Sequence, residues 1–489
     1  MSILVVDVGT SGVRGAVVRP DATVEHIHHV PVLPDSPFPG LVEFDGDAIA
    51  AAVREVATRS LADGGPVDAV GIANQRASTL VWDRATGVPV APGLGWQDLR
   101  TVGTCLELQA QGIRVAPNAS ATKLAAILDQ VDPDRSRAER GELAFGTIDT
   151  WVAWVLSDGA LHVTDASNAG VTGLIHGDGD GWSEHLLSAL RIPAAVLPGI
   201  VDSSGIVGQA STLAGAPPIA GMAGDQQASL IGQSCTTAGR AKATFGTGGM
   251  LDQCVGPTRP PQLVRGPAGT IPIIAWRRNG RVTWGLEAIM LSAGTCIEWL
   301  RDDLRIIDDA AHSATVAAAC DDTGDVWFVP ALLGLGTPVW DFGARGTFTG
   351  LTRGSGRPEL VRAVLEGIAH RGADLLESAE TDSGLPIDTL RVDGGMTANP
   401  VFTQALADAC GRPIEVSPVL EATTLGAAFL AGMAVGTWTD EDDVAAAWMP
   451  RAEVLPRHSD DERTAARSRW LEARSRAEGA VPELSGIDF

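Results

Sequence analysis

The sequence predicts an α/β protein made of two related lobes that face each other across a cleft. The chain has 489 residues, which is more than one hydrophobic core organises. Short apolar runs rich in β-branched residues alternate with helical patterns, as they do in α/β proteins. A strand that leads through a glycine-containing turn into a second strand occurs at residues 3–18 and again at residues 240–255. This repeat indicates two lobes, each with a loop facing the cleft.

The first hairpin begins with the apolar run Ile3–Val6, which is typical of a buried strand. Asp7 follows, and the turn after it holds Thr10, Ser11 and Arg14. Glycines let backbone amides approach an anion, hydroxyls donate hydrogen bonds, and an arginine adds positive charge. The turn is therefore a candidate cradle for phosphate, although a plain polar hairpin explains the same residues. It is not a P-loop, because it leads to a strand rather than a helix.

The second hairpin carries Thr247 between two glycines at its turn. One such turn is weak evidence for a phosphate site, and its duplication strengthens that interpretation. The stretch Glu287–Leu300 is interpreted as a helix that carries Gly294 and Glu298.

Asp225 lies at the centre of the most informative stretch, Gly221–Ser229. A strand-like run ends in glycine, and a carboxylate, two amides and small residues that suit the start of a helix follow. Such an acid could accept a proton from a substrate hydroxyl. The alternative interpretation is that Asp225 only caps a helix that begins near Gln226.

Polar side chains also follow the predicted strand at residues 69–73. Gln75 and Arg76 stand at its end, where open α/β sheets place their ligands. Trp96 could form a wall against the carbon skeleton of a polyol. The alternatives are surface hydrogen bonds for the polar residues and a core position for the tryptophan.

Near the C-terminal end of the chain, the patterns predict a strand at 390–393, a helix at 400–410, a strand at 414–416 and a helix at 424–433. Gly395 and Asn399 connect the first strand to the first helix. Glycines there would allow the base of a nucleotide to approach, and Asn399 could bond ribose or base. A tight turn with an asparagine N-cap explains the same residues.

The composition limits the classes of partner. The formal net charge of −24 argues against general affinity for nucleic acid or an anionic membrane. The six cysteines show no CxxC spacing, which suits reduced thiols in a cytoplasmic protein. The N-terminus lacks the basic and apolar regions of a signal peptide, and no apolar run is long enough to span a membrane.

These motifs, in this order, resemble the FGGY family of carbohydrate kinases, and within it the glycerol kinases. The resemblance runs from Ile3 to about Trp438. The stretches that carry it are residues 7–14, 74–76, 146–151, 224–227, 246–248 and 393–395, together with the C-terminal family signature at 346–366. So many motifs in the same order make a chance likeness improbable.

The resemblance implies two ribonuclease H-like lobes of the actin and sugar-kinase type, with the active site in the cleft between them. We expect an N-terminal lobe at residues 1–238, a C-terminal lobe at 239–445, and a peripheral segment at 446–489. A small polyol or sugar would be the substrate. The oligomeric state stays open, with a homodimer or homotetramer compatible with the resemblance.

The resemblance also implies roles for single residues. Asp225 would be the general base, and Asp7 would help Asp225 to position Mg²⁺, partly through water. Arg76, Trp96, Asp225 and Gln226 would bind the substrate. The residues implied for ATP are Thr10, Ser11, Arg14, Thr247, Gly294, Glu298, Gly395 and Asn399. Phosphoryl transfer depends mostly on positioning and charge neutralisation, so such a set suffices.

The sequence departs from the glycerol kinase pattern in the substrate pocket. Ala77 replaces a glutamate that would grip a substrate hydroxyl, and Asn118 lies near the expected place of a substrate-binding tyrosine. Ala126 replaces the tryptophan expected after Lys123. Loss of a hydrogen-bonding carboxylate costs on the order of 1.5–3 kcal/mol, enough to change which substrate is preferred.

Three functions therefore compete. The first is ATP-dependent phosphorylation of a polyol or sugar hydroxyl, with glycerol as the default and a tetritol, pentitol or ketopentose as the alternative. The second is a nucleotide-binding or sugar-binding sensor without phosphoryl transfer. The third is a chaperone-like ATPase on the same fold. Asp225 and both phosphate-facing hairpins favour the kinase.

Overall fold

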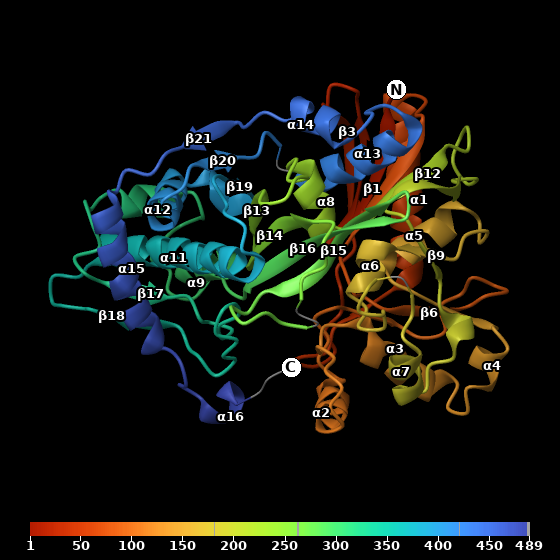
Figure 1. Ribbon diagram of the computed structural model, residues 1–489, viewed down its shortest axis with the longest axis horizontal. Coiled ribbons are helices and arrows are strands. Elements are labelled where there is room, and N and C mark those ends of the chain that lie inside the picture. The colour runs from red at the N-terminus through yellow and green to blue at the C-terminus, as the bar shows by residue number, and fades with distance from the viewer. Residues whose placement is uncertain (180, 262–263, 420, 487–489) are drawn as a thin grey trace.

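A single large sheet runs through the molecule (Figure 1). The computed structural model describes residues 1–179, 181–261, 264–419 and 421–486. In spatial order, the thirteen strands found within these residues are β21 (Ala452–Val454), β20 (Ile414–Val416), β19 (Leu390–Asp393), β13 (Ala241–Phe245), β14 (Gly249–Gly256), β16 (Arg281–Met290), β15 (Ile271–Arg278), β11 (Ser204–Gln209), β12 (Pro218–Gly224), β5 (Ala69–Asn74), β1 (Ile3–Val8), β2 (Gly12–Val18) and β3 (Val24–Pro31).

The two halves of this sheet have the same topology. In the first half, β1 pairs antiparallel with β2, β2 pairs antiparallel with β3, and β5 and β12 continue in parallel on the other side of β1. In the second half, β13, β14 and β16 are antiparallel neighbours, and β19 and β20 continue in parallel beyond β13. The predicted pair of related α/β lobes is therefore confirmed, and we call these halves the first and second lobe.

The lobes share one continuous sheet rather than two separate ones. They join where β11 of the first lobe meets β15 of the second, through the single register pair Ser204↔Arg278. Such a short junction holds the lobes edge to edge with few backbone hydrogen bonds. Most of the contact between the lobes therefore comes from side chains and helices.

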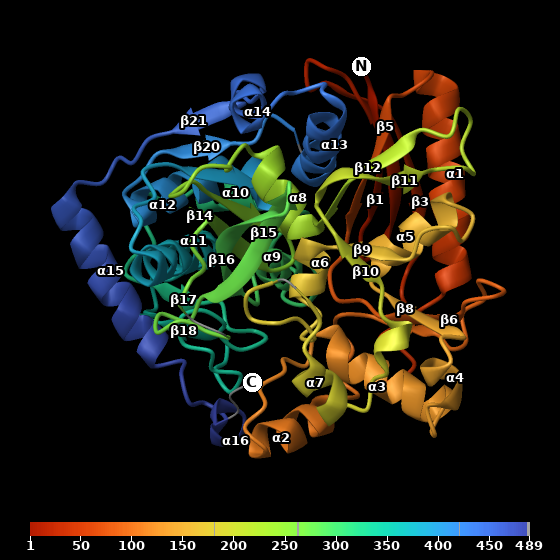
Figure 2. The same ribbon diagram turned by 45° about the vertical axis from the view of Figure 1, so that its right-hand side comes forward.

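The helices cover both faces of the sheet (Figure 2). Those of the first lobe are α1 (Gly46–Gly64), α2 (Val102–Ala110), α3 (Ser120–Val131), α4 (Ser136–Glu139), α5 (Ile148–Leu156), α6 (Ala166–Gly170), α7 (Glu184–Ala189), the 3₁₀ turn η1 (Ala194–Val196) and α8 (Asp225–Gly232). Those of the second lobe and the end of the chain are α9 (Gly294–Asp302), α10 (His312–Ala317), α11 (Arg357–Ser383), η2 (Gly395–Ala398), α12 (Pro400–Cys410), α13 (Ala422–Val435), α14 (Glu441–Ala447), α15 (Asp460–Ser475) and α16 (Pro482–Ser485).

The remaining strands form two-stranded sheets outside the large one. They are the pairs β4 (Glu43–Phe44) with β7 (Gly93–Leu94), β6 (Leu80–Asp83) with β8 (Leu143–Gly146), β9 (Val163–Asp165) with β10 (Gly199–Val201), and β17 (Trp327–Val329) with β18 (Thr347–Thr349).

Strand β1 is buried along its whole length because both of its faces are covered. Leu4 and Val6 pack in the core that contains α1 and α5, whereas Ile3 and Val5 pack in the core that contains α8 and α13. A strand buried on both faces reads as a continuous apolar run, which is what the sequence showed at residues 3–6. The strand predicted there is confirmed.

The helix expected over residues 287–300 is wrong in its first part. Residues 281–290 form β16, which pairs with β14 on one side and β15 on the other, and a helix begins only at Gly294. A short apolar run does not distinguish a buried strand from a buried helix. Pairing with two neighbouring strands decides the matter here. Glu287 therefore lies on a sheet face rather than on a helix.

Helix α13 follows β20 in the chain but packs against the first lobe. Its closest partner is α8, where a Cβ atom added to Gly426 would lie 1.7 Å from the carbonyl oxygen of Ala228. A Cβ added to Gly232 would lie 1.9 Å from the carbonyl oxygen of Ala422. Glycines at both positions thus let the two backbones touch, which fixes the position of α8 relative to α13.

The end of the chain lies along the outside of the second lobe as α15 (Figure 1). Although most of α15 is exposed, Trp470 is fully buried and donates a hydrogen bond to Asp374 of α11. Burial raises the pKa of Asp374, but Arg371, Arg467 and Arg474 outweigh it and lower that pKa to about 2. This ion cluster fastens residues of the expected peripheral segment to α11.

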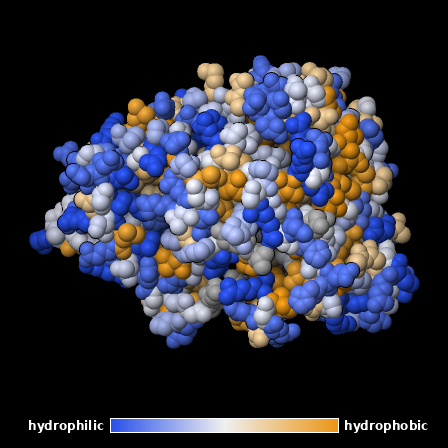
Figure 3. Space-filling view, viewed as in Figure 1, coloured by the Kyte–Doolittle hydropathy of each residue, from blue (hydrophilic) through white to orange (hydrophobic). Residues whose placement is uncertain are grey.

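The surface carries no large apolar face on the side shown in Figure 3, where hydrophobic residues form scattered groups between hydrophilic ones. Among the described residues, every helix is too short or too polar to cross a bilayer.

The contact between α8 and α13 makes a direct prediction about stability. Gly426→Ala should force the two backbones apart and destabilise the protein by about 3 kcal/mol, the upper end for overpacking. Thermal unfolding would measure this as a midpoint lower by several degrees. Gly103→Ala is the matched control, because Gly103 is exposed in α2 with no atom near its added Cβ. A Gly426→Ala midpoint equal to that of the control would show that the helices are free to separate.

Candidate active site

Three parallel strands of the first lobe end at one point, and each delivers a candidate residue there. Asp7 lies near the end of β1, Arg76 follows β5, and Asp225 follows β12. The register pairs Val8 with Asn74 and Asn74 with Gly224, so the three strand ends lie side by side. The sequence predicted these residues separately, and the sheet brings them together at the carboxyl edge where α/β folds bind ligands.

Asp225 is the first residue of α8, directly after the N-cap Gly224. One carboxylate oxygen, Oδ1, accepts a hydrogen bond from the Gln226 amide at 2.8 Å and lies 3.4 Å from Arg76 Nε. The side chain is still 36% exposed, so the carboxylate keeps an open side. Burial raises the pKa of Asp225, and Arg76 acts against that rise. The interpretation of Asp225 as the N-cap is wrong, because Gly224 is the N-cap and Asp225 is the first residue of the helix. The role of Asp225 as a proton acceptor stays a prediction.

Arg76 contacts Asp225 and also side chains of the second lobe. Its Nη2 lies 2.6 Å from the Glu287 carboxylate of β16 and 3.8 Å from the sulfur of Met250. Gly224 makes room for it, since a Cβ there would lie 2.6 Å from the Arg76 Cγ. Arg76 therefore links the end of β5 in the first lobe to β16 in the second lobe.

Asp7 is almost fully buried beside Arg14, whose Nη1 lies 3.5 Å from its carboxylate. The pKa of Asp7 is raised to about 7, because burial and the charges of Asp225 and Glu421 raise it more than Arg14 lowers it. The site therefore has more carboxylates than cations to neutralise them. Such a surplus favours the binding of a cation or a proton.

Arg14 also forms an ion pair with Glu421, which precedes α13. The sequence placed Arg14 toward the ATP phosphates, and the structure shows it paired with the carboxylate at the start of α13. A phosphate group arriving here would compete with Glu421 for the same guanidinium.

The first hairpin and Trp96 lie next to each other. Trp96 Nε1 donates a hydrogen bond to Thr10 Oγ1 at 3.3 Å, which joins a predicted substrate residue to a predicted ATP residue. Ser11 is exposed at the tip of the hairpin. Lys123 is fully buried and donates to the backbone carbonyls of Trp96 and Pro117, so it fixes the loop that carries Trp96.

The second hairpin contacts the N-terminus of α9. Gly294 N donates to the Gly246 carbonyl at 2.8 Å, and the Thr295 hydroxyl donates to the Thr247 carbonyl at 2.8 Å. A Cβ on Gly294 would lie 2.6 Å from the Gly246 oxygen, so this contact requires glycine. The Thr247 side chain stays exposed, and Glu298 is exposed one turn further along α9.

The two residues expected to contact the adenosine differ in exposure. Gly395 is exposed with open space around its Cα. The Asn399 side chain is buried: its oxygen accepts from the Val401 and Phe402 amides, and its nitrogen donates to Ser313 Oγ at 3.0 Å. The side chain of Asn399 thus caps α12, and a bond to ribose or base would require it to leave these partners.

Sequence reasoning missed three charged residues of the second lobe that border this site. Lys242, Asp252 and Glu287 are all buried on neighbouring strands of the sheet. Lys242 Nζ lies 2.7 Å from the Asp252 carboxylate and 2.6 Å from the side-chain oxygen of Gln226. A signal was present, because isolated charges inside apolar strands are rare unless they are paired.

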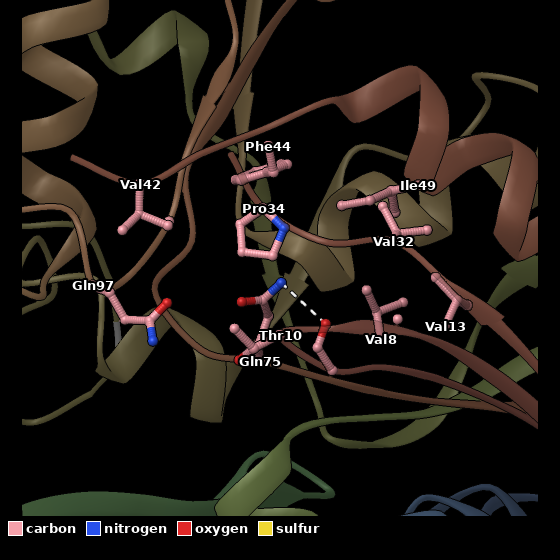
Figure 4. A pocket seen from close by; sticks show the side chains of 13 residues that line it. Val8, Thr10, Val13, Val32, Pro34, Val42, Phe44, Ile49, Gln75 and Gln97 are labelled. Carbon is pink, nitrogen blue, oxygen red and sulfur yellow. Dashed lines mark hydrogen bonds between the residues drawn. The ribbon is translucent and has the colours of Figure 1, made fainter. Parts of the chain in front are cut away.

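Two hollows are found in the described part of the chain. A cavity of about 10 Å³, room for one water, lies behind the first hairpin, where Gln75 donates to the Gly9 carbonyl at 3.3 Å (Figure 4). Apolar side chains such as Val32 and Phe44 form its wall. A groove of about 850 Å³ lies between α11, α12 and residues 453–458. Neither is lined by Asp225 or Arg76.

Comparisons with known proteins find matches over almost the whole length of the chain. The model of the N-terminal domain of the FGGY family of carbohydrate kinases matches residues 2–232, and that of the C-terminal domain matches residues 241–435. The glycerol kinase of Trichlorobacter lovleyi is 41% identical over 493 residues, covering 98% of this chain and 99% of its own. That of Aromatoleum aromaticum is 42% identical over 495 residues, with the same coverage.

Solved structures show the same fold. The crystal structure of Plasmodium falciparum glycerol kinase with ADP has a TM-score of 0.90 and 29% identity, covering 100% of this chain and 99% of that one. A ligand-bound xylulose kinase from Lactobacillus acidophilus has a TM-score of 0.86 at 21% identity, covering 99% of each chain, and shows the fold alone. The lobe boundaries at residues 238 and 445 stay a prediction. Both family models and the full-length relatives place this protein in the FGGY family of carbohydrate kinases.

Proposed function

We propose that this protein transfers the γ-phosphoryl group of ATP to a hydroxyl of glycerol or a closely related polyol, with Asp225 as the general base. The observation that carries the proposal is the placement of Asp225, whose carboxylate has one open side at the point where β1, β5 and β12 end. The full-length glycerol kinase relatives support the reaction class and make glycerol the first substrate to test.

In the proposed reaction, the acceptor hydroxyl gives its proton to Asp225 as its oxygen forms a bond to the γ-phosphorus. The bond between that phosphorus and the bridging β,γ-oxygen breaks, and ADP leaves. Burial suits Asp225 to this task, because a carboxylate with a raised pKa is a better proton acceptor. Arg76, Trp96 and Gln226 would hold the acceptor beside it.

The nucleotide would lie between the two hairpins. We assign its contacts to Thr10, Ser11, Arg14, Thr247, Gly294, Glu298, Gly395 and Asn399. The support is that both hairpin turns present open glycines and hydroxyls. Among the described residues, the side-chain partners of Arg14 are the carboxylates of Asp7 and Glu421, which phosphates would replace. For Asn399 the assignment requires the cap of α12 to open.

Asp7 and Asp225 are suited to holding Mg²⁺. No group of three metal-binding side chains is preformed among the residues described. Two carboxylates are nevertheless enough for Mg²⁺, because this ion commonly binds through one or two carboxylates, waters and substrate phosphates. The raised pKa of Asp7 marks it as a carboxylate short of positive charge. The ion would neutralise charge on the transferred phosphoryl group.

The identity of the acceptor depends on the pocket near Ala77. Ala77 is buried with a positive φ of 60°, and its carbonyl accepts a hydrogen bond from Ser120 Oγ at 2.9 Å. That bond ties it to the start of α3, close to the loop of Asn118, which is exposed. The missing carboxylate at residue 77 favours a larger polyol or a ketose as the alternative acceptor.

A screen of acceptors tests the reaction. We expect coupled ADP release with glycerol or with one of the tetritols, pentitols and ketopentoses, and a loss of turnover of about 10²–10⁴-fold in Asp225→Asn, as for other general bases. If Asp225→Asn retains the turnover of the wild-type enzyme, the assignment of the base is wrong. If the wild-type protein binds ATP but phosphorylates no acceptor, the sensor function is favoured instead.

Restoring the carboxylate tests the substrate pocket. Ala77→Glu should lower the KM for glycerol by roughly tenfold or more, because a hydrogen bond to a charged group is regained. Ala77→Gln is the matched control, since it has the same length without the charge. A wild-type enzyme that already turns over glycerol efficiently, with no gain from Ala77→Glu, would rule out an altered acceptor.

The burial of Asp7 predicts that its ionised carboxylate lowers the free energy of unfolding. An acid whose folded-state pKa is raised from 3.8 to about 7 contributes stability below pH 3.8 and loses it as the pH rises through 7. Asp7→Asn should therefore raise the free energy of unfolding at pH 8 by up to about 4 kcal/mol. Without added ligand, this would be measured as a higher thermal midpoint. The gain should shrink toward pH 4.

The exposed Asp388 provides the matched control, Asp388→Asn, which should change little at either pH. Mg-ATP should narrow the difference between wild type and Asp7→Asn, because binding stabilises the wild-type protein more. A lower midpoint for Asp7→Asn at pH 8 would show that the bond of Asp7 to Arg14 outweighs its burial.

A further inference from the structure

A row of charged side chains crosses the sheet of the second lobe underneath the site. Lys242 on β13 lies opposite Asp252 on β14, and Asp252 lies opposite Glu287 on β16. Directly opposed residues in antiparallel strands point to the same face, so the three side chains form one line. Arg76 reaches the end of this line from the first lobe and contacts Glu287 at 2.6 Å.

Lys242 is the buried cation at the other end of the row. Its side chain and that of Asp252 are both fully buried, with Nζ 2.7 Å from the carboxylate. Nζ has two further partners, the Thr244 hydroxyl at 3.0 Å and the side-chain oxygen of Gln226 at 2.6 Å. The buried ammonium therefore donates two hydrogen bonds and forms an ion pair with Asp252.

The contact with Gln226 determines which way its amide faces. An ammonium group only donates hydrogen bonds, so the Gln226 carbonyl oxygen must face Lys242. The amide nitrogen then points to the other side, where the partly exposed Gln226 has no acceptor among the residues the structure describes. This nitrogen belongs to the residue next to Asp225, in the first turn of α8.

We propose that Lys242 is a positioning residue that fixes the Gln226 amide so that its NH₂ group donates to an oxygen of the acceptor. The inference rests on the proposed function and deepens it, since it names the group that an acceptor must present: an oxygen with a free lone pair, from a hydroxyl or a carbonyl.

The test needs a variant that folds without the lysine. Lys242→Met alone would leave the Asp252 carboxylate buried without its cation. The double variant Lys242→Met/Asp252→Asn removes both charges, and its thermal midpoint reports whether it folds. Asp252→Asn alone is the matched control, because it keeps Lys242 beside Gln226. Gln226→Leu removes the amide itself.

We expect Lys242→Met/Asp252→Asn to raise the KM for the acceptor on the order of three- to tenfold, the weight of one oriented hydrogen bond. The KM for ATP should stay unchanged, and Asp252→Asn should retain the KM of the wild-type enzyme for the acceptor. Adding Gln226→Leu to the double variant should cause no further rise, because both changes remove the same interaction.

An unchanged acceptor KM in the double variant would overturn the proposal, as would independent, multiplying effects of Gln226→Leu. An equal rise in Asp252→Asn would assign the effect to the charge row rather than to the amide. Calorimetric titration with glycerol provides a second readout that needs no turnover. If wild-type protein binds glycerol without phosphorylating it, only the proposed function fails. Normal turnover with unaffected Lys242 variants means that only the present inference fails.

Discussion

The close approach of α8 and α13 is the constraint on which the rest of the site depends. Backbone meets backbone at Gly232 and Gly426, so neither helix can move toward the other or carry a side chain at the contact. Because α8 begins with Asp225, this contact also fixes the position of the Asp225 carboxylate relative to α13. Because Glu421 directly precedes α13, the same contact also fixes the position of the carboxylate that pairs with Arg14.

The same packing creates an excess of negative charge in the cleft. Asp7, Asp225 and Glu287 all have raised pKa values, caused first by burial and countered by only a few cations. Burying charge in this way costs folding free energy. The arrangement becomes favourable when positive charge arrives, which is what a magnesium ion with a bound nucleotide would bring.

Side chains, more than backbone, connect the two lobes at the cleft. The sheet is continuous through one register pair, whereas Arg14 with Glu421, Arg76 with Glu287 and Lys242 with Gln226 each join one lobe to the other. All three contacts involve residues that we assign to ligand binding or that contact such residues. Ligands that replace these partners therefore act on the relative position of the lobes as well as on the local site.

The sequence by itself determined the family of the protein and several of its local elements. Strands 390–393 and 414–416 and helix 400–410 lie where the patterns placed them, because turn residues and apolar periods are local properties. The ordered motifs around Asp7, Arg76 and Asp225 were enough to indicate a two-lobed kinase. Only the tertiary structure decided that residues 281–290 form a strand, that Asn399 is occupied as a cap, and that Lys242 holds Gln226. These facts depend on which strands pair and which charges meet across the fold, and such contacts between distant residues leave no periodic trace in a single sequence.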